Sequence, residues 1–123
     1  MGVDLAEVPR IRSAVERHGQ HFLERVYTKR ELAYVDRRGA VNRFERLAAR
    51  FAAKEAGMKA IGTGWRRGVG WQDFEVSNLS SGRPTLLLHG AAGRVAAELG
   101  VRNVVLSLTH TAEQAMAVVI LES

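Results

Sequence analysis

A stripe of apolar residues at spacings of three and four runs through the middle of the chain. This period is that of one buried face of an α-helix, so it predicts a helix over residues 41–60. The stripe is formed by Phe44, Leu47, Ala48, Phe51 and Ala52. Continued by the same steps, it passes through Glu55 and reaches Met58. A carboxylate therefore stands where the pattern calls for an apolar side chain.

Glu55 has two interpretations. A buried ionised carboxylate is costly unless a cation, a hydrogen-bond network or a metal lies beside it. Lys54 flanks it, and Lys59 lies one turn further on, in the favourable Glu-to-Lys order. Glu55 could thus mark a functional site. It could also belong to an ordinary ion pair on an exposed helix, because the neighbouring alanines leave the buried face ambiguous.

The first residues of the chain, G-V-D-L-A-E-V, predict a strand over 2–8. By alternation, Val3 and Leu5 face one way, and Asp4 and Ala6 face the other. Aspartate is depleted in strands, so Asp4 needs an explanation. It either lies at the edge of a cleft, where the strand leads into a helix, or serves as a turn or capping residue.

Three short helices, studded with arginine, are predicted between residues 9 and 38. Pro9 suits the first turn of the first helix, and Gly19 suits its end. Thr28 and Glu31 have the T-x-x-E spacing of a capping box, which predicts the start of the third. The basic surface of this segment is either a solvated helix face or a docking site for an acidic partner.

From residue 69 the apolar period changes to two, which is typical of strands. The pattern predicts a hairpin, then an alanine-rich helix, then two more strands. The expected ranges are 70–77 and 84–89 for the hairpin, 91–99 for the helix, and 104–109 and 115–121 for the last strands. We therefore expect an α+β fold, with a small antiparallel sheet packed against the long central helix and shorter helices.

His110 stands at the end of the predicted strand 104–109 and shares a face with Val104, Leu106 and Leu108. A lone histidine in such a place is more often structural than catalytic. The hydroxyl groups around it could nevertheless hold a phosphate. They belong to Ser107, Thr109 and Thr111.

The composition fits one globular domain. The chain has 123 residues, 46% hydrophobic and 25% charged, so we expect a single domain over 1–123 with one core. The absence of cysteine excludes a disulfide framework, a thiolate zinc site and a thiol nucleophile. No apolar run approaches the roughly 18 residues of a membrane span, and the first residues lack the pattern of a signal peptide. We expect a soluble, cytoplasmic protein.

The net charge of +5 is concentrated in the first half of the chain. Residues 1–60 hold 13 Lys and Arg against 8 Asp and Glu, which gives +5, whereas residues 61–123 hold 5 of each, which gives 0. Most of the basic residues are arginine, whose planar fork suits carboxylates and phosphates. The basic half could meet nucleic acid, a phosphorylated small molecule or an acidic protein.

Four segments together resemble the holo-acyl-carrier-protein synthases, the small bacterial 4′-phosphopantetheinyl transferases. They are G-V-D-L-A-E-V at 2–8, R-F-A-A-K-E-A-x-x-K-A-x-G-T-G at 50–64, G-R-P at 82–84 and S-L-T-H-T at 107–111. They stand in the family's order and at its spacing over almost the whole chain. One departure is Gly57, where the family often has a bulkier residue. A glycine inside a helix costs about 1 kcal/mol relative to alanine.

The resemblance implies the 4′-phosphopantetheinyl transferase fold and an Mg²⁺-dependent reaction. The 4′-phosphopantetheine arm of coenzyme A would pass to a serine of an apo acyl carrier protein, as in fatty acid biosynthesis, and leave adenosine 3′,5′-bisphosphate. The catalytic residues would be Asp4 and Glu55, which hold Mg²⁺, and Lys59, beside the phosphates or the serine. Magnesium accepts one or two protein carboxylates and completes its octahedron with water and phosphate. Either Glu55 or a metal-bound water could take the serine proton.

The resemblance also assigns binding residues and an assembly. The coenzyme A contacts would be Arg50, Lys54, Lys59, Gly62, His110 and Thr111. The contacts to the acidic recognition helix of the carrier protein would be Arg10, Arg17 and Arg25. The family works as a homotrimer with active sites at subunit interfaces, so the same assembly is expected here.

Two other interpretations of the basic half compete with this one. A non-enzymatic nucleic-acid-binding module would need exposed aromatic residues among the basic ones, so that bases can stack on them. The candidates are Phe22, Tyr27, Tyr34 and Phe44. A structural domain that only binds an acidic carrier protein would leave the G-T-G and S-L-T-H-T segments unused. The nucleic-acid module also leaves Asp4 and Glu55 unexplained. We expect neither nucleic acid nor a membrane among the partners.

Overall fold

A computed structural model describes all 123 residues and contains the five strands and five α-helices predicted from the sequence. In chain order the elements are β1 Gly2–Glu7, α1 Val8–His18, α2 Gln20–Val26, α3 Lys29–Arg37, α4 Arg43–Ile61, the 3-10 helix η1 Trp71–Asp73, β2 Phe74–Asn78, β3 Pro84–Leu88, α5 Gly90–Glu98, β4 Asn103–His110 and β5 Gln114–Glu122. The fold is α+β, as expected.

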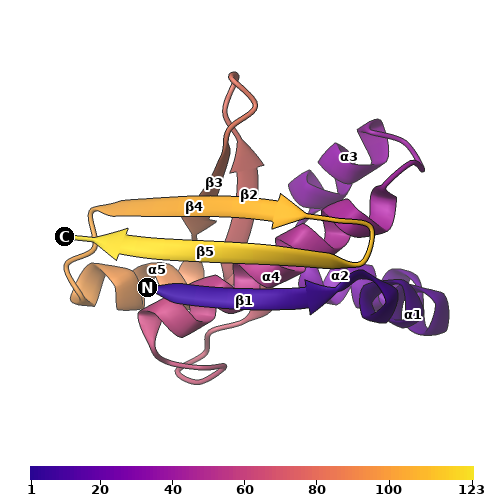
Figure 1. Ribbon diagram of the computed structural model, residues 1–123. Coiled ribbons are helices and arrows are strands. Elements are labelled where there is room, and N and C mark those ends of the chain that lie inside the picture. Colours follow the sequence, from indigo (N-terminus) through magenta and orange to yellow (C-terminus); the bar gives the residue numbers. More distant parts are fainter.

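Two antiparallel sheets pack around α4. The larger sheet has the strand order β1–β5–β4, and β2 and β3 form a separate hairpin. Figure 1 shows the three-stranded sheet in front of α4, with α1, α2 and α3 gathered at one end of the molecule and α5 at the other. No helix of the chain combines the length and apolar character needed to cross a membrane.

Small residues allow α4 to pack closely against both sheets. Its alanines Ala48, Ala52 and Ala56 are fully buried in the core. On the side of the hairpin, a Cβ atom at Gly57 would lie 2.8 Å from Cδ1 of Phe74 and 3.1 Å from Cδ2 of Leu86. Gly57 is therefore a point of close contact between α4 and the hairpin.

β1 lies directly on α4, and its side chains alternate as predicted. A Cβ atom at Gly2 would overlap the carbonyl oxygen of Ala56, so only glycine permits this approach. Asp4 and Ala6 point toward α4, whereas Val3 and Leu5 are exposed on the outer face of the sheet. The first strand therefore directs its acidic residue inward and two apolar residues outward.

Caps and local turns explain several of the element boundaries. Thr28 and Glu31 form the predicted capping box at the start of α3, and Gly19 ends α1 with a φ of 55°. One boundary differs from the prediction, since β2 begins at Phe74 and not near residue 70. The carboxylate of Asp73 accepts hydrogen bonds from the backbone amides of Gly70 and Ala92, which holds the preceding residues in η1.

Candidate active site

Asp4 forms an ion pair with Lys59 in the last turn of α4. Lys59 Nζ lies 2.7 Å from Asp4 Oδ1, and the Asp4 side chain is 15% exposed. The hydrogen bond to Asp4 raises the pKa of Lys59, so the ammonium group stays charged. The close packing of β1 on α4 thus brings together two of the three predicted catalytic residues, which are 55 positions apart in the sequence.

Glu55 lies one helical turn before Lys59 and beside Asp4. Burial raises the pKa of Glu55, the negative charge of Asp4 raises it further, and the positive charge of Lys59 opposes both. Glu55 forms no ion pair with Lys54 or Lys59, whose carboxylate partners are other residues. A carboxylate that stands near another carboxylate without its own cation would be relieved by a bound metal ion. This arrangement favours a functional site over an ordinary ion pair.

A cavity of about 410 Å³ opens where β1, α1, α2 and α4 meet. Its walls consist of acidic and apolar side chains and one arginine. They are Asp4, Leu5, Ala6, Glu7, Arg10, Ile11, Ala14, Phe22, Phe51 and Glu55. The structure thus unites the two predicted metal ligands with Arg10, one of the predicted contacts to the carrier protein. We call this hollow the carboxylate cavity.

The carboxylate cavity offers hard oxygen donors in the number that a magnesium ion takes from a protein. No group of three or more His, Cys, Asp or Glu side chains is arranged to hold a metal ion. Asp4 and Glu55 are two carboxylates in one wall, and Asp4 Oδ2 is not engaged by Lys59. This donor set suits a cation that keeps several water or phosphate ligands, and it does not suit zinc.

A second cavity, of about 350 Å³, lies between α3, α4, β4 and the β2–β3 hairpin. Its lining is basic and contains two of the predicted coenzyme A contacts, Arg50 and His110. The residues are Tyr34, Arg38, Asn42, Arg46, Ala49, Arg50, Asn78, Pro84, Leu108 and His110. His110 Nδ1 lies 2.9 Å from Glu45 Oε1. We call this hollow the arginine cavity.

Arg50 is held in the arginine cavity with part of its hydrogen-bonding capacity unused. The residue is 4% exposed. Its guanidinium lies 4.3 Å from the ring centroid of Tyr34, and Nη2 donates to Asn78 Oδ1 at 3.1 Å. Burial lowers the pKa of Arg50. The buried Nε atoms of Arg50 and Arg46 have no acceptor in the protein, so both side chains keep unpaired donors behind the basic wall of the cavity.

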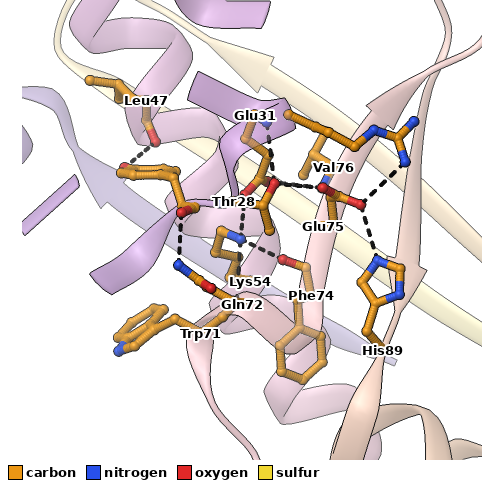
Figure 2. Close-up of polar contacts among 12 residues, drawn as sticks. Thr28, Glu31, Leu47, Lys54, Trp71, Gln72, Phe74, Glu75, Val76 and His89 are labelled. Atoms are coloured by element: carbon orange, nitrogen blue, oxygen red, sulfur yellow. Dashed lines mark hydrogen bonds and ion pairs between the residues drawn. The ribbon is translucent and has the colours of Figure 1, made fainter. Parts of the chain in front are cut away.

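The structure contradicts the predicted coenzyme A contact of Lys54. Figure 2 shows its ammonium group inside the protein, where the side chain is 0% exposed. The group lies 2.6 Å from Glu31 Oε1 and donates to the backbone carbonyls of Trp71 and Phe74. An ammonium has three donors, and these three acceptors use them all. The assignment is therefore wrong for Lys54, which is a buried structural cation.

Gly62 and Thr111 lie outside both cavities. Gly62 ends α4 with a φ of 80°, and nothing lies within 4 Å of the position its Cβ would take. The hydroxyl oxygen of Thr111 accepts hydrogen bonds from the backbone amides of Glu113 and Gln114, which closes the turn between β4 and β5. Their predicted contacts with coenzyme A stay predictions.

The predicted contacts to the carrier protein are exposed arginines on the surface formed by α1 and α2. Arg10, Arg17 and Arg25 all face solvent. Arg10 lines the carboxylate cavity, whereas Arg25 lines another hollow together with Trp65 and Trp71. The exposed positions fit a docking role, and only Arg10 reaches the candidate metal ligands.

The two cavities are separate within one chain. They share no lining residue. Between them α4 packs on the sheet through fully buried alanines, Ala48, Ala52 and Ala56. The structure therefore brings Asp4, Glu55 and Lys59 together, and it brings Arg50 and His110 together, but it does not join these two sets.

Sequence reasoning missed several residues that organise the site. Glu31 was identified only as a cap, whereas its carboxylate is the partner of Lys54. Glu75 was not identified, although it is buried and binds Thr28 and His89. A glutamate between Phe74 and Val76 in a predicted strand was a signal that it needs a partner.

Comparison with known proteins places the chain in a family. The model of the 4′-phosphopantetheinyl transferase superfamily matches residues 1–119. The chain belongs to this superfamily. A holo-[acyl-carrier-protein] synthase of Solibacter usitatus is 66% identical over 122 residues, a match that covers 99% of this chain and 96% of that protein.

Solved structures of 4′-phosphopantetheinyl transferases share the fold. The crystal structure of holo-[acyl-carrier-protein] synthase from Neisseria meningitidis has a TM-score of 0.89 and 32% identity, and the match covers 99% of this chain and 96% of that chain. A holo-(acyl-carrier-protein) synthase from Bacillus anthracis in complex with CoA (3′,5′-ADP) has a TM-score of 0.80 and 35% identity, with 99% and 94% covered.

Proposed function

We propose that this chain is an Mg²⁺-dependent holo-acyl-carrier-protein synthase of the cytoplasm, acting in fatty acid biosynthesis. It transfers the 4′-phosphopantetheine arm of coenzyme A to a serine of an apo acyl carrier protein and releases adenosine 3′,5′-bisphosphate. The observation that carries the proposal is the pairing of Asp4 and Glu55 in one cavity beside Lys59. These are the residues of the two motifs by which the chain resembles the synthases, and its family is the 4′-phosphopantetheinyl transferase superfamily.

Asp4 and Glu55 would hold Mg²⁺, which supplies positive charge to the pyrophosphate oxygens when it is bound. The transfer of a phosphoryl group depends mainly on positioning and on positive charge near these oxygens. Lys59 adds a fixed ammonium at the same place, because its ion pair with Asp4 keeps it charged and oriented. Either Glu55 or a metal-bound water would take the serine proton.

The arginine cavity would bind the phosphates at the adenosine end of coenzyme A. The basic lining of the cavity, with Arg38, Arg50 and His110, supports this role, since guanidinium groups bind phosphate oxygens well. The cavity is separate from the carboxylate cavity within one chain. We infer that one molecule of coenzyme A contacts the carboxylate cavity of one subunit and the arginine cavity of another.

The outer face of the three-stranded sheet supports assembly into a homotrimer. Large apolar side chains are exposed there on β1 and β5. They are Val3, Leu5, Met116 and Ile120. A contiguous exposed apolar face is typical of a protein–protein interface. Contact through this face would place β1 beside a neighbouring subunit.

The carrier protein would dock on α1 and α2 at the mouth of the carboxylate cavity. Arg10, Arg17 and Arg25 supply positive charge for an acidic helix. The apolar walls around Ile11 and Phe51 suit a segment of the carrier that enters beside its serine. The competing nucleic-acid module lacks support, because Tyr27 is buried and the other candidate aromatics are only partly exposed.

One assay tests the function. The protein is incubated with coenzyme A, Mg²⁺ and an apo acyl carrier protein, and the carrier is weighed by mass spectrometry. We expect the added mass of one phosphopantetheine group. The variants Glu55→Gln and Asp4→Asn should lose at least about 100-fold in turnover, as expected when a charge that acts in the transition state is removed. A folded wild-type protein that adds no mass would refute the proposal.

The same assay with limiting Mg²⁺ tests the metal assignment. The chain offers a matched control, Glu98→Gln, which removes an exposed carboxylate paired only with Arg67. We expect wild-type turnover from this control at every Mg²⁺ concentration. Near wild-type turnover of Asp4→Asn or Glu55→Gln at limiting Mg²⁺ would show that the metal is held elsewhere.

A further inference from the structure

A single buried carboxylate joins α3, α4 and β2. Glu31 is 1% exposed and belongs to α3. Its Oε1 accepts from the backbone amide of Thr28 at 2.9 Å and lies 2.6 Å from Lys54 Nζ on α4, while Oε2 accepts from the amide of Val76 on β2 at 2.9 Å. Figure 2 shows these contacts converging on Glu31 from its own helix, from α4 and from the hairpin.

Lys54 completes this joint from the side of α4. Its ammonium binds Glu31 and the carbonyls of Trp71 and Phe74, at the start of the hairpin. Hydrogen bonds to a carboxylate and to carbonyl oxygens are directional, so the three contacts together fix the rotation of α4 against α3 and the hairpin. Apolar packing alone is not directional and would leave this rotation less closely defined.

Arg50 forms a second contact layer between the same three elements. On α4, Arg50 stands four residues before Lys54. Its guanidinium stacks on Tyr34, which follows Glu31 by three residues on α3. It also donates a hydrogen bond to Asn78, which follows Val76 by two residues on β2. These steps correspond to shifts of about 6, 4.5 and 6.6 Å along the helices and the strand. The Arg50 layer therefore lies next to the Glu31–Lys54 layer, and both span α3, α4 and β2.

We propose that Glu31 and Lys54 are positioning residues that set the affinity for coenzyme A by fixing Arg50 in the arginine cavity. The Arg50 side chain donates one hydrogen bond, to Asn78 on β2, and stacks on Tyr34 on α3. The positions of α3 and β2 against α4 depend on the buried pair. Loss of the pair lets α3 and β2 shift against α4, and the guanidinium leaves its position. The proposal rests on the proposed role of that cavity as a coenzyme A site.

The carboxylate cavity depends on a different contact of α4. Successive residues of a helix point about 100° apart, so Lys54 and Glu55 face different neighbours. Lys59 is held by Asp4 on β1, which Glu31 does not touch. Removal of the buried pair should therefore weaken coenzyme A binding and leave the metal-binding side intact.

The test is a variant in which Glu31→Gln and Lys54→Met are combined. Glutamine keeps the capping-box spacing, and methionine fills a similar volume without charge. Loss of a buried pair as a whole is tolerated far better than loss of one partner. We expect KM for coenzyme A to rise at least about tenfold, as expected from a displacement of about 1 Å. Turnover number and half-saturating Mg²⁺ should stay within about threefold of wild type.

A double-mutant cycle with Arg50→Met separates positioning from general damage. If the pair acts through Arg50, its removal should raise KM for coenzyme A in the wild-type background and have little effect in the Arg50→Met background. Equal effects in both backgrounds, an unchanged KM in a folded variant, or a loss confined to turnover number would each overturn the proposal. The matched control is Glu98→Gln, which breaks an exposed ion pair and should leave KM unchanged.

Circular dichroism and thermal melting establish that the variants are folded before the kinetics are measured. If the combined variant does not fold, Glu31→Met combined with Lys54→Met is measured instead, because it also leaves no buried charge without a partner, and the same cycle applies. The two proposals fail in different ways. A wild-type protein that transfers nothing refutes the proposed function, whereas transfer with an unchanged KM in the variants refutes only the positioning role.

Discussion

At the scale of single residues, Glu55 is held in a place that disfavours its own ionisation. Burial and the charge of Asp4 raise its pKa above the ordinary value of 4.5. A raised pKa of an acid means that the folded state binds the proton more tightly than the unfolded state. Ionised Glu55 therefore lowers the free energy of unfolding as pH rises through and above 4.5.

Glu55→Gln should stabilise the metal-free protein at pH 7 while it removes activity. Glutamine cannot ionise, so the repulsion from Asp4 is absent. The gain should be no more than about 1 kcal/mol, because Glu55 is partly exposed and solvent screens its charge. Thermal melts at pH 4 and pH 7 measure it, and the gain should appear only at the higher pH. A variant less stable than wild type at pH 7 would contradict this account of the site.

The ionisation of Glu75 has the opposite effect on stability from that of Glu55. Burial opposes its ionisation, but hydrogen bonds from Thr28 and His89 and the charge of Arg30 outweigh burial, so its pKa is lowered. Its contribution to stability is thus present above its ordinary pKa of 4.5 and is lost as pH falls through the lower, folded value.

Glu75→Gln should reduce the free energy of unfolding at pH 7 by about 1–3 kcal/mol, the usual effect of losing hydrogen bonds to a buried charge. The difference from wild type should shrink as the pH is lowered from 5 to 3. Urea titrations at each pH measure it. Glu98→Gln, at an exposed position, should show no such pH-dependent difference. A difference that stays constant with pH would mean that Glu75 is not ionised in the folded protein.

At the scale of elements, Gly57 lowers the helix propensity of α4 but allows close contact with the hairpin. Gly57→Ala gains about 1 kcal/mol of helix propensity, but the new methyl group overlaps Phe74 and Leu86. Overpacking typically costs about 1–3 kcal/mol, so we expect a net loss of up to about 2 kcal/mol in urea titrations. A second change, Phe74→Leu, should recover part of it. A stabilised Gly57→Ala protein would mean that the hairpin can move away from α4.

The elements themselves were predictable because each carried a local signal. The apolar stripe gave α4, the capping box gave the start of α3, and the period of two gave the strands. The apolar stripe did not predict which charged residue of α4 is buried. It placed Glu55 on the buried face, whereas in the structure Lys54 is the fully buried one. Alanines on every side blur the faces of this helix, and the partner of Lys54, Glu31, lies 23 positions earlier. Only the packing of α3 and the hairpin decides which charge is enclosed.

At the scale of the whole molecule, the site residues fall into two groups that the sequence could not separate. Arg50 and Glu55 are five residues apart on one helix, yet they line different cavities. The family resemblance supplied both sets, but the separation follows from the order β1–β5–β4, which puts Asp4 and His110 on strands at opposite edges of one sheet. One chain alone therefore holds two halves of the proposed site that do not meet.

Mixed assemblies of two inactive variants should recover activity. Glu55→Gln destroys the carboxylate half and Arg50→Met weakens the arginine half. If each active site takes one half from each of two adjacent subunits in a ring, random mixing pairs an intact half with an intact half in about a quarter of the sites. The two variants are unfolded together, refolded at equal concentration and assayed at a coenzyme A concentration where neither is active alone. If each site were built within one chain, every chain would carry one damaged half, and the mixture would stay as inactive as its components.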